Sequence, residues 1–444
     1  MFSFSVPLGK LVRAASRLRG GGSAFPGLVV EKIDPRFMQR TLSSLPFGVA
    51  VVSGTNGKTT TTKMVVELLE SQGLKVFTNR TGSNFTRGVA AALLGAVDWR
   101  GQLDADVAVL ELDEAHAVHF VNMVQPRYSL LLNVLRDQLD RFGEIDKTAQ
   151  LLERIAVKTT GTVVLNREDP RVLRIASSLK PQADGGPSVL YFGLDTSLRS
   201  TFPNDDDMRS SGSDTSAASS PTAVDGSDLP PADVVLRRVG TQDADFEFDG
   251  ELVSTRMKLR GVYNIFNAAA ALALARAIVT ASGRQPSMAD GDRLVKALSE
   301  VAPAFGRGES LVVDGQPLDL VLVKNPSGFR LGLKSFPAEG YATMIAINDN
   351  YADGRDMSWL WDVDFESLRQ DGVDLVSGVR AYDMALRLQY DDVPVGGVET
   401  DIPAALAAFI SGAEGKPKRV FCTYTAMLAI RRELSKITAV EVVS

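Results

Sequence analysis

Apolar residues along this chain fall into short runs that alternate with helical patterns. From residue 47 onward, runs rich in Val and Leu are followed by stretches in which apolar residues recur every three or four positions. Strands are expected at 47–53, 74–78, 106–112, 128–133 and 162–166, and helices at 59–73 and 147–157. Such alternation predicts a parallel β-sheet with helices on its faces.

The second half of the chain repeats this pattern after a change of composition. β-like segments occupy 245–259, a helix of small residues follows over 264–280, and a second α/β alternation begins near Leu318. The segment 301–308 supplies Pro and Gly between the two patterns, which is typical of a domain boundary. We therefore predict a lead-in with a basic helix at 1–46, a central domain at 47–304 and a C-terminal domain at 305–444.

Cysteine and histidine are too scarce for several kinds of site. The chain holds one Cys and two His among its 444 residues. This excludes an internal disulfide framework and a four-cysteine zinc site, so no zinc is expected, whereas oxygen-liganded cations such as Mg2+ remain compatible. Cys422 lies in an apolar, strand-like segment, and we interpret it as a buried structural thiol.

The net charge of −6 comes from one segment. Residues 202–234 contain seven Asp and one base, so the rest of the chain is neutral overall. This distribution provides no basic surface for nucleic acid, and we expect none to be bound. The segment from about 199 to 233 is rich in Ser, Asp, Ala and Pro and has little to bury, so we predict a disordered insertion in the central domain.

The N-terminal segment is basic. Four bases stand among its apolar residues, at Lys10, Arg13, Arg17 and Arg19. They interrupt any signal-peptide core, so we expect a cytoplasmic protein. A short amphipathic helix packed on the first domain and a helix docked on the inner face of the membrane are both compatible with this pattern. No apolar run reaches the roughly 18 residues of a membrane span, since the longest candidate, 268–279, is interrupted by an arginine.

The strongest chemical signal is a glycine-rich turn between an expected strand and an expected helix. The sequence SGTNGKTT at 53–60 follows the apolar run VAVV and leads into TTKMVVELLE. In a phosphate loop, glycines let backbone N–H groups face phosphate oxygens, a Lys reaches the β- and γ-phosphates, and a Thr hydroxyl binds Mg2+. The strict pattern is not met, because Val52 replaces its first Gly. We predict nucleotide binding by the loop, with the Lys on its surface, through Gly54, Thr55, Asn56, Gly57, Lys58, Thr59 and Thr60.

This loop sequence resembles that of the Mur ligases and folylpolyglutamate synthetases. LELDEA at 110–115 resembles the strand end from which a Glu binds Mg2+ in that family, which implicates Glu111, with Glu114 as a helper. NVLRDQLDRFG at 133–143 resembles a further family segment, with Gln138 in place of the usual His. The order and spacing of these matches along one chain distinguish them from isolated coincidences.

Two further matches concern the nucleotide. GVYNIFNAAAA at 261–271 resembles the helix start whose Asn side chains meet adenine, which implicates Asn264 and Asn267. FGRGES resembles the element that brings an Arg to the phosphates, which implicates Arg307. Each match also has a plainer interpretation: helix packing for the asparagines, a linker charge for the Arg, and a strand-end cap for Glu111.

Four segments of the C-terminal part resemble one branch of this family, the MurT ligases. They are VKNPSGF at 323–329, INDNYADGRDMSWLWDVDFE at 347–366, SGVRAYDMALRL at 377–388 and TYTAMLAIRREL at 423–434. The MurT branch also has Gln at this position of the NVLRDQLDRFG segment. The resemblance covers nearly the whole chain except the acidic insertion. It implies the α/β Mur ligase fold, in which a phosphate-loop-type parallel-sheet ATPase domain is followed by a smaller α/β C-terminal domain.

The resemblance also implies a reaction and its ligands. MurT ligases are synthetase subunits that use ATP to amidate the D-glutamate α-carboxyl of the lipid II stem peptide, through an acyl phosphate, to D-isoglutamine. ATP and Mg2+ are therefore expected, with the metal at Thr59 and Glu111. Ammonia is expected from a class-I glutaminase subunit of the GatD type, bound as a heterodimer. Asp356 is the position expected to complete the glutaminase Cys-His pair, although an Asx turn is its plainer interpretation and Asp353 is the nearest rival.

Two other functions remain compatible with the sequence. A relative that adds an amino acid would need an amino-acid pocket in the C-terminal domain, which the segment 349–361 does not resemble. A nucleotide-binding scaffold without catalysis would serve to anchor a partner. Such a scaffold would not need Lys58, Thr59, Glu111 and Arg307 together.

Overall fold

Two compact units make up the chain. The computed structural model describes residues 5–18, 25–79, 85–135, 145–202, 229–283, 288–302 and 307–440. The first unit contains Met1–Val134, Asp146–Met257 and Asn264–Val301, and the second contains Leu135–Ile145, Lys258–Tyr263 and Ala302–Ser444. Most of the predicted disordered insertion, 203–228, and most of the NVLRDQLDRFG segment, 136–144, lie outside the described residues.

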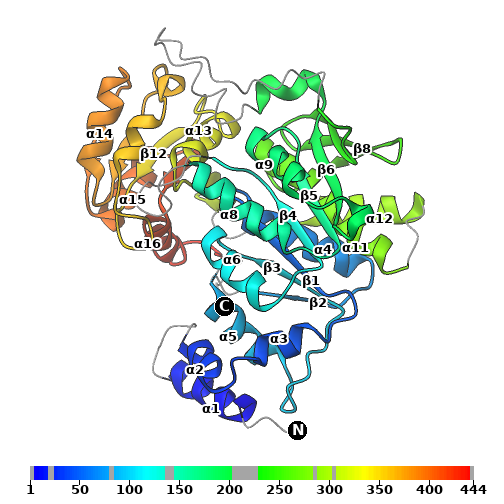
Figure 1. The fold of residues 1–444 in the computed structure, drawn as a ribbon. Helices are drawn as coiled ribbons and strands as arrows, with labels where there is room; N and C mark the ends of the chain where they lie inside the picture. Colours follow the sequence, from blue (N-terminus) through cyan, green and yellow to red (C-terminus); the bar gives the residue numbers. More distant parts are fainter. Residues whose placement is uncertain are drawn as a thin grey trace. The chain divides into compact units, whose positions relative to one another are not determined.

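A nine-stranded sheet forms the centre of the first unit (Figure 1). Its strands are β1 (Val49–Ser53), β2 (Val76–Thr78), β3 (Val107–Glu111), β4 (Tyr128–Leu131), β5 (Thr162–Asn166), β6 (Ser188–Leu194), β7 (Val234–Val239), β8 (Asp243–Phe248) and β9 (Glu251–Arg256). The spatial order is β2-β3-β1-β4-β5-β6-β7-β8-β9, parallel from β2 to β7 and antiparallel from β7 to β9. β1, β3 and β4 are buried at every residue, as expected for parallel strands covered on both faces.

Helices of the first unit follow the strands, as the alternation predicts. They are α1 (Ser5–Leu18), α2 (Phe25–Ile33), α3 (Phe37–Leu42), α4 (Lys58–Ser71), α5 (Thr86–Ala96), α6 (Glu114–Met123), α8 (Ile145–Val157), α9 (Pro170–Arg174), α11 (Val262–Ala281) and α12 (Met288–Glu300), with 3₁₀ turns η1 (Ile175–Ser178), η2 (Gln182–Asp184) and η3 (Thr196–Thr201). The helix α1 packs on α2 and α5, so the basic N-terminal segment is helical and attached to this unit.

The helix α11 is long and apolar enough to cross a membrane. Its 20 residues include a window with a mean hydropathy of 1.5, so the prediction that no segment meets this test is wrong. The prediction failed because it required an unbroken apolar run, whereas a span tolerates a few polar residues. In the structure 67% of that window is buried. A helix that is apolar all round and buried in this way is typical of a protein core.

The second unit contains a six-stranded mixed sheet. Its strands are β10 (Arg307–Val313), β11 (Gln316–Leu322), β12 (Ala342–Ala346), β13 (Leu375–Ser377), β14 (Val398–Glu399) and β15 (Lys418–Cys422). The order is β10-β11-β15-β12-β13-β14, and only the β10–β11 pair is antiparallel. The helices are α13 (Pro326–Ser335), α14 (Ala381–Tyr390), α15 (Ile402–Gly412) and α16 (Tyr424–Leu434), with 3₁₀ turns η5 (Ser358–Asp362) and η6 (Glu366–Leu368).

Two apolar clusters form the core of the second unit. One is built around Phe329, whose ring packs edge-on against Phe365 and tilted against Phe421. The other includes Cys422 and residues of α15 and α16. Burial raises the pKa of the Cys422 thiol, so this group stays protonated and inert, as a structural thiol should.

Candidate active site

The glycine-rich loop lies at the carboxyl end of β1, between β3 and β4. Here the order of the strands reverses, which is where open α/β sheets bind ligands. Gly54 and Gly57 have φ angles of 134° and 88°. Residues with a Cβ rarely adopt such angles. Gly57 is also the N-cap of α4, so the loop has the backbone of a phosphate-binding turn with a helix N-terminus directly behind it.

Lys58 is buried, and the prediction that it lies on the surface is wrong. Its side chain is 8% exposed. Its Nζ donates to the Gly54 carbonyl oxygen at 2.6 Å and to Glu114 Oε1 at 3.1 Å. Glu114, the first residue of α6, is itself buried. The loop thus curves around its own lysine, and a carboxylate more than 50 residues away in the sequence supplies the counter-charge.

Thr59 and Glu111 lie in contact beside this lysine. Thr59 Oγ1 donates to Glu111 Oε1 at 2.7 Å. A hydroxyl and a carboxylate suit Mg2+, which proteins hold through one or two carboxylates while phosphates and waters complete its shell. The oxygens present therefore fit the predicted metal. Within the described residues no group of three or more His, Cys, Asp or Glu is suited to hold a metal.

Asn79 fixes the backbone of Glu111, a role that the sequence did not reveal. Asn79 follows β2 directly and is buried. Its Nδ2 donates to the Glu111 carbonyl oxygen at 2.8 Å, and its Oδ1 accepts from the Glu111 N–H at 3.0 Å. A side-chain amide that pairs with both backbone groups of one residue holds that residue in a single position. The Glu111 carboxylate is thereby held toward the loop.

Asn133 holds the phosphate loop in the same way. Its Oδ1 accepts from the Asn56 N–H at 2.9 Å, and its Nδ2 donates to the Asn56 carbonyl oxygen at 3.0 Å. Its own carbonyl oxygen accepts from the Thr55 N–H at 3.0 Å. The sequence indicated the segment 133–143 only as a family match. Hydrogen bonds between residues 77 positions apart leave no local pattern from which this contact could be predicted.

We expect Asn133→Ala to weaken ATP binding by roughly thirtyfold, since two hydrogen bonds of about 1 kcal/mol each hold the loop in shape. Isothermal titration calorimetry with ATP measures the change. Asn122→Ala, at an exposed position of α6, is the matched control and should bind ATP normally. Equal affinities of the two variants would show that the Asn133 contact does not order the loop for nucleotide.

The helix α11 brings Asn267 against the loop. A Cβ built on Gly57 would lie 2.7 Å from Asn267 Oδ1, so the amide touches this glycine. Asn264 is three residues earlier in the same helix, and residues at this spacing lie on one face. The loop and the predicted adenine-binding helix therefore meet in the first unit. Adenine binding by the two asparagines stays a prediction.

Arg307 belongs to the second unit. It is the first residue of β10, where it pairs in register with Val321 of β11. The predicted contact of Arg307 with the phosphates of the nucleotide stays a prediction.

Asp356 lies in the loop between β12 and η5. Its Oδ1 accepts from the Ser358 N–H at 2.9 Å, which is the Asx turn of the plainer interpretation. In the part of the chain that the structure describes, its other carboxylate oxygen has no hydrogen-bond partner. The turn therefore fixes the direction of the side chain and leaves one oxygen for another molecule.

Asp353, the rival position, is committed to the fold. It is buried and accepts from the Thr425 N–H at 2.7 Å, from the Thr425 hydroxyl at 2.5 Å and from the Asn350 N–H at 3.1 Å. Burial raises its pKa. These bonds tie the loop to the first turn of α16, so Asp356 is the more accessible of the two carboxylates.

Asp169 joins the site to β5. It caps α9, accepting from the Arg171 and Val172 N–H groups at 2.9 and 3.1 Å, and it also accepts from the Val134 N–H at 2.6 Å. Val134 directly follows the loop-holding Asn133. Burial raises the pKa of Asp169 to about 6.

The raised pKa of Asp169 predicts a pH dependence of stability. The folded state binds this proton more tightly than the unfolded chain. The Asp169 carboxyl therefore adds to the free energy of unfolding below about pH 4, and this contribution is lost as the pH rises to about 6. The full effect is about 3 kcal/mol. Urea unfolding measured across this pH range should show that the free energy of unfolding declines less in Asp169→Asn than in the unchanged protein. If the free energy of unfolding depends on pH in the same way in both proteins, the raised pKa of Asp169 is contradicted.

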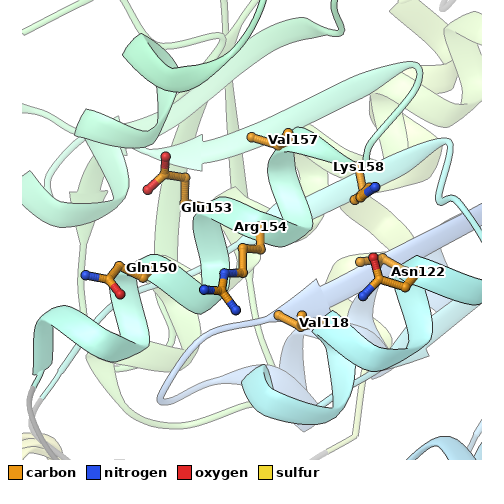
Figure 2. Close-up of a pocket in the computed structure, with 8 residues that line it drawn as sticks. Val118, Asn122, Gln150, Glu153, Arg154, Val157 and Lys158 are labelled. Atoms are coloured by element: carbon orange, nitrogen blue, oxygen red, sulfur yellow. The ribbon is translucent and has the colours of Figure 1, made fainter.

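A surface groove lies between α6 and α8 (Figure 2). Its lining consists of Val118, Val121, Asn122, Gln150, Glu153, Arg154, Val157 and Lys158. None of these residues belongs to the phosphate loop or to its partners. The groove is therefore distinct from the candidate site.

Comparison with known proteins identifies the family. The model of the Mur ligase middle domain matches residues 52–275, and that of the MurT ligase C-terminal domain matches residues 322–427. The lipid II isoglutaminyl synthase subunit MurT of Streptococcus pneumoniae is 30% identical over 95% of this chain and 94% of its own length. The chain belongs to the MurT family. The MurT subunit of Staphylococcus aureus is 28% identical over 91% of each chain.

A solved structure supports the same assignment at the level of the fold. MurF ligase from Thermotoga maritima, in complex with ADP, has a TM-score of 0.63 at 16% identity, with 90% of this chain and 82% of that chain covered. The predicted α/β Mur ligase fold is thus confirmed, and membership of the MurT family makes the protein a ligase. The roles of the individual site residues stay predictions.

Proposed function

We propose that this MurT-family ligase is the synthetase subunit that amidates the D-glutamate α-carboxyl of the lipid II stem peptide to D-isoglutamine. The observation that carries the proposal is a pair of contacts at one loop, Lys58 with Glu114 and Thr59 with Glu111. This loop lies in a chain that is similar over nearly its whole length to a lipid II isoglutaminyl synthase subunit.

The reaction needs an activated carboxyl group, because a carboxylate is a poor acyl donor at neutral pH. A carboxylate oxygen attacks the γ-phosphorus of ATP, ADP leaves, and an acyl phosphate results. Ammonia then attacks the carbonyl carbon, the C–O bond to phosphate breaks, and a proton lost from nitrogen leaves the neutral amide. Positioning and charge neutralisation are what the protein contributes.

The chain's own residues fit these tasks. Lys58 places an ammonium group inside the loop, where it neutralises charge on the transferring phosphoryl oxygens. Mg2+ held by Thr59 and Glu111 would supply further positive charge at the same phosphates. We assign Asn264 and Asn267 to the adenine and Arg307 to the phosphates.

Ammonia has to come from another subunit under this proposal. Cys422 is buried in β15 and its pKa is raised, so it is unsuited to act as a glutaminase nucleophile. We propose a class-I glutaminase of the GatD type as the partner. Asp356 would orient the catalytic His of that partner and stabilise its imidazolium form. Because lipid II is a lipid, the enzyme would act at the inner face of the cell membrane.

Reconstitution tests the proposal. The purified chain is combined with a class-I glutaminase from the same organism, lipid II, ATP, Mg2+ and glutamine, and the stem peptide is analysed by mass spectrometry. We expect conversion of one carboxyl to an amide, dependent on ATP, with high ammonium able to replace glutamine and its glutaminase. An unchanged stem peptide in both assays would refute the proposal, and incorporation of an amino acid would favour the alternative ligase function.

A further inference from the structure

The outer side of α1 carries leucines where a surface helix normally carries polar residues. Leu8 is 46% exposed and Leu11 is 64% exposed. The opposite side of the helix packs on α2 and α5, with Gly9 buried against Val30 and Leu94. Since that inner side already attaches the helix to the first unit, the exposed parts of the two leucines lie outside this packing.

Trp99, in the turn after α5, is a further exposed apolar side chain beside α1. Its side chain is 65% exposed, and the Lys10 ammonium lies 5.4 Å from the centroid of its ring. Lys10 Nζ also donates to the Val97 carbonyl oxygen at 2.7 Å, which fixes the turn after α5 alongside α1. Tryptophan is largely buried on average in folded proteins, so this exposure is unusual. We refer to Leu8, Leu11 and Trp99 together as the α1 surface.

The helix α1 and the turn beside it are basic. The sequence of α1 contains no acid; of its bases, Lys10 lies at the Trp99 ring and Arg13 lies against Gly95 of α5. Arg100, next to Trp99, is exposed. The nearest acid in the sequence, Asp98, accepts from the backbone N–H groups of Arg100 and Gln102, both at 2.8 Å, and so caps its own turn.

We propose that the α1 surface docks this ligase on an anionic lipid bilayer. Leucine and tryptophan side chains insert at the boundary between headgroups and acyl chains, where Trp is enriched in membrane proteins, and adjacent bases attract anionic headgroups. The absence of any acid from the sequence of α1, together with the exposed Arg100, suits the anionic headgroups to which bases near a bilayer surface are attracted. The inference rests on the proposed function for its purpose, which is to bring the enzyme to a substrate held in the membrane.

Vesicle sedimentation tests the docking without any assay of amidation. The full chain is mixed with vesicles of phosphatidylcholine alone, or of equal parts phosphatidylcholine and phosphatidylglycerol. We expect binding to the anionic vesicles that weakens as salt is added. Leu11→Gln/Trp99→Gln should lower the partition coefficient roughly tenfold or more, because burial of either side chain contributes at least that factor. Arg100→Gln should lower it less.

Matched controls make the result decisive. Leu252→Gln, at a 61% exposed leucine of β9, should bind vesicles like the unchanged chain. All variants should keep their melting temperature, because the replaced side chains are exposed. Absence of binding to anionic vesicles, or equal binding by the double variant, would overturn the proposal. Light scattering checks self-association and binding to the glutaminase. A double variant that loses only one of these, and still binds vesicles, would also overturn the proposal. Amidation of a water-soluble stem peptide is measured separately, so its failure would count against the proposed function alone.

Discussion

Lys58→Ala should lower ATP-dependent turnover by roughly 10³-fold or more, because a cation at the transferring phosphoryl group is among the largest contributions to such catalysis. The Lys58 ammonium lies inside the loop, 2.6 Å from the Gly54 carbonyl oxygen. Release of phosphate from ATP in the presence of lipid II and ammonium measures the effect. Turnover near that of the unchanged protein would remove the loop from the mechanism.

The same substitution should also destabilise the fold, because Glu114 would remain buried without its 3.1 Å partner. Removal of one member of a buried ion pair costs about 3–5 kcal/mol. A loss of activity could therefore reflect unfolding. The double variant Lys58→Ala/Glu114→Gln separates the two causes, since it removes both charges. We expect it to recover most of the lost melting temperature while staying inactive. Recovery of activity together with stability would show that Lys58 acts only in folding.

The elements that the sequence predicted well are those with a local physical signature. β1 is a continuous apolar run, which is typical of a parallel strand buried on both faces. The loop after it combines glycines, a Lys and a Thr within a few residues, so one segment of sequence contains the whole phosphate-loop pattern. Glu111 was indicated by the resemblance of LELDEA to a family segment, and the structure places it as the last residue of β3.

The residues that the sequence did not reveal act across long sequence distances. Asn79 and Asn133 each use an amide to pair with the backbone of another segment, 32 and 77 residues away. An asparagine after a strand is equally typical of a turn, so its type and position do not indicate such a contact. The burial of Lys58 has the same origin, because its partner Glu114 comes from a separate helix.

The composition of α11 shows a different limit of prediction from the sequence. A helix in the centre of a domain and a helix in a bilayer are both apolar on every side. Only the position of the helix between other elements distinguishes them, and sequence alone does not contain that position. For α11, burial of 67% of its most apolar window supplies this information.

Asp356→Asn should sharply lower amidation supported by glutamine and leave amidation supported by high ammonium nearly unchanged. A neutral amide cannot balance the positive charge of an imidazolium, and it can favour the wrong tautomer of the neutral ring. By analogy with other catalytic triads, the expected loss in the glutamine-dependent rate is on the order of 10²-fold or more. Lys58, Thr59 and Glu111 are not altered by this change and still form the acyl phosphate.

The local structure makes Asp356→Asn a well-matched substitution. The Asx turn uses one side-chain oxygen, which accepts from the Ser358 N–H, and an asparagine retains such an oxygen. The loop should therefore keep its shape and its affinity for the glutaminase, which pull-down at equal concentrations checks. Asp353→Asn is the contrasting control, because it replaces a carboxylate oxygen that accepts a hydrogen bond in the fold. It should lower the melting temperature and reduce both activities.

The two nitrogen sources separate three roles for Asp356. Loss with glutamine alone places the carboxylate in the partner's glutaminase site. Equal loss with glutamine and ammonium would place it in the synthetase reaction or in folding, and the melting temperature distinguishes these. No loss with either source would leave Asp356 as a turn residue, and the second oxygen that the turn does not use would then have no catalytic role. Because only the first outcome requires a second polypeptide, the assay also tests the proposed partner through one residue of this chain.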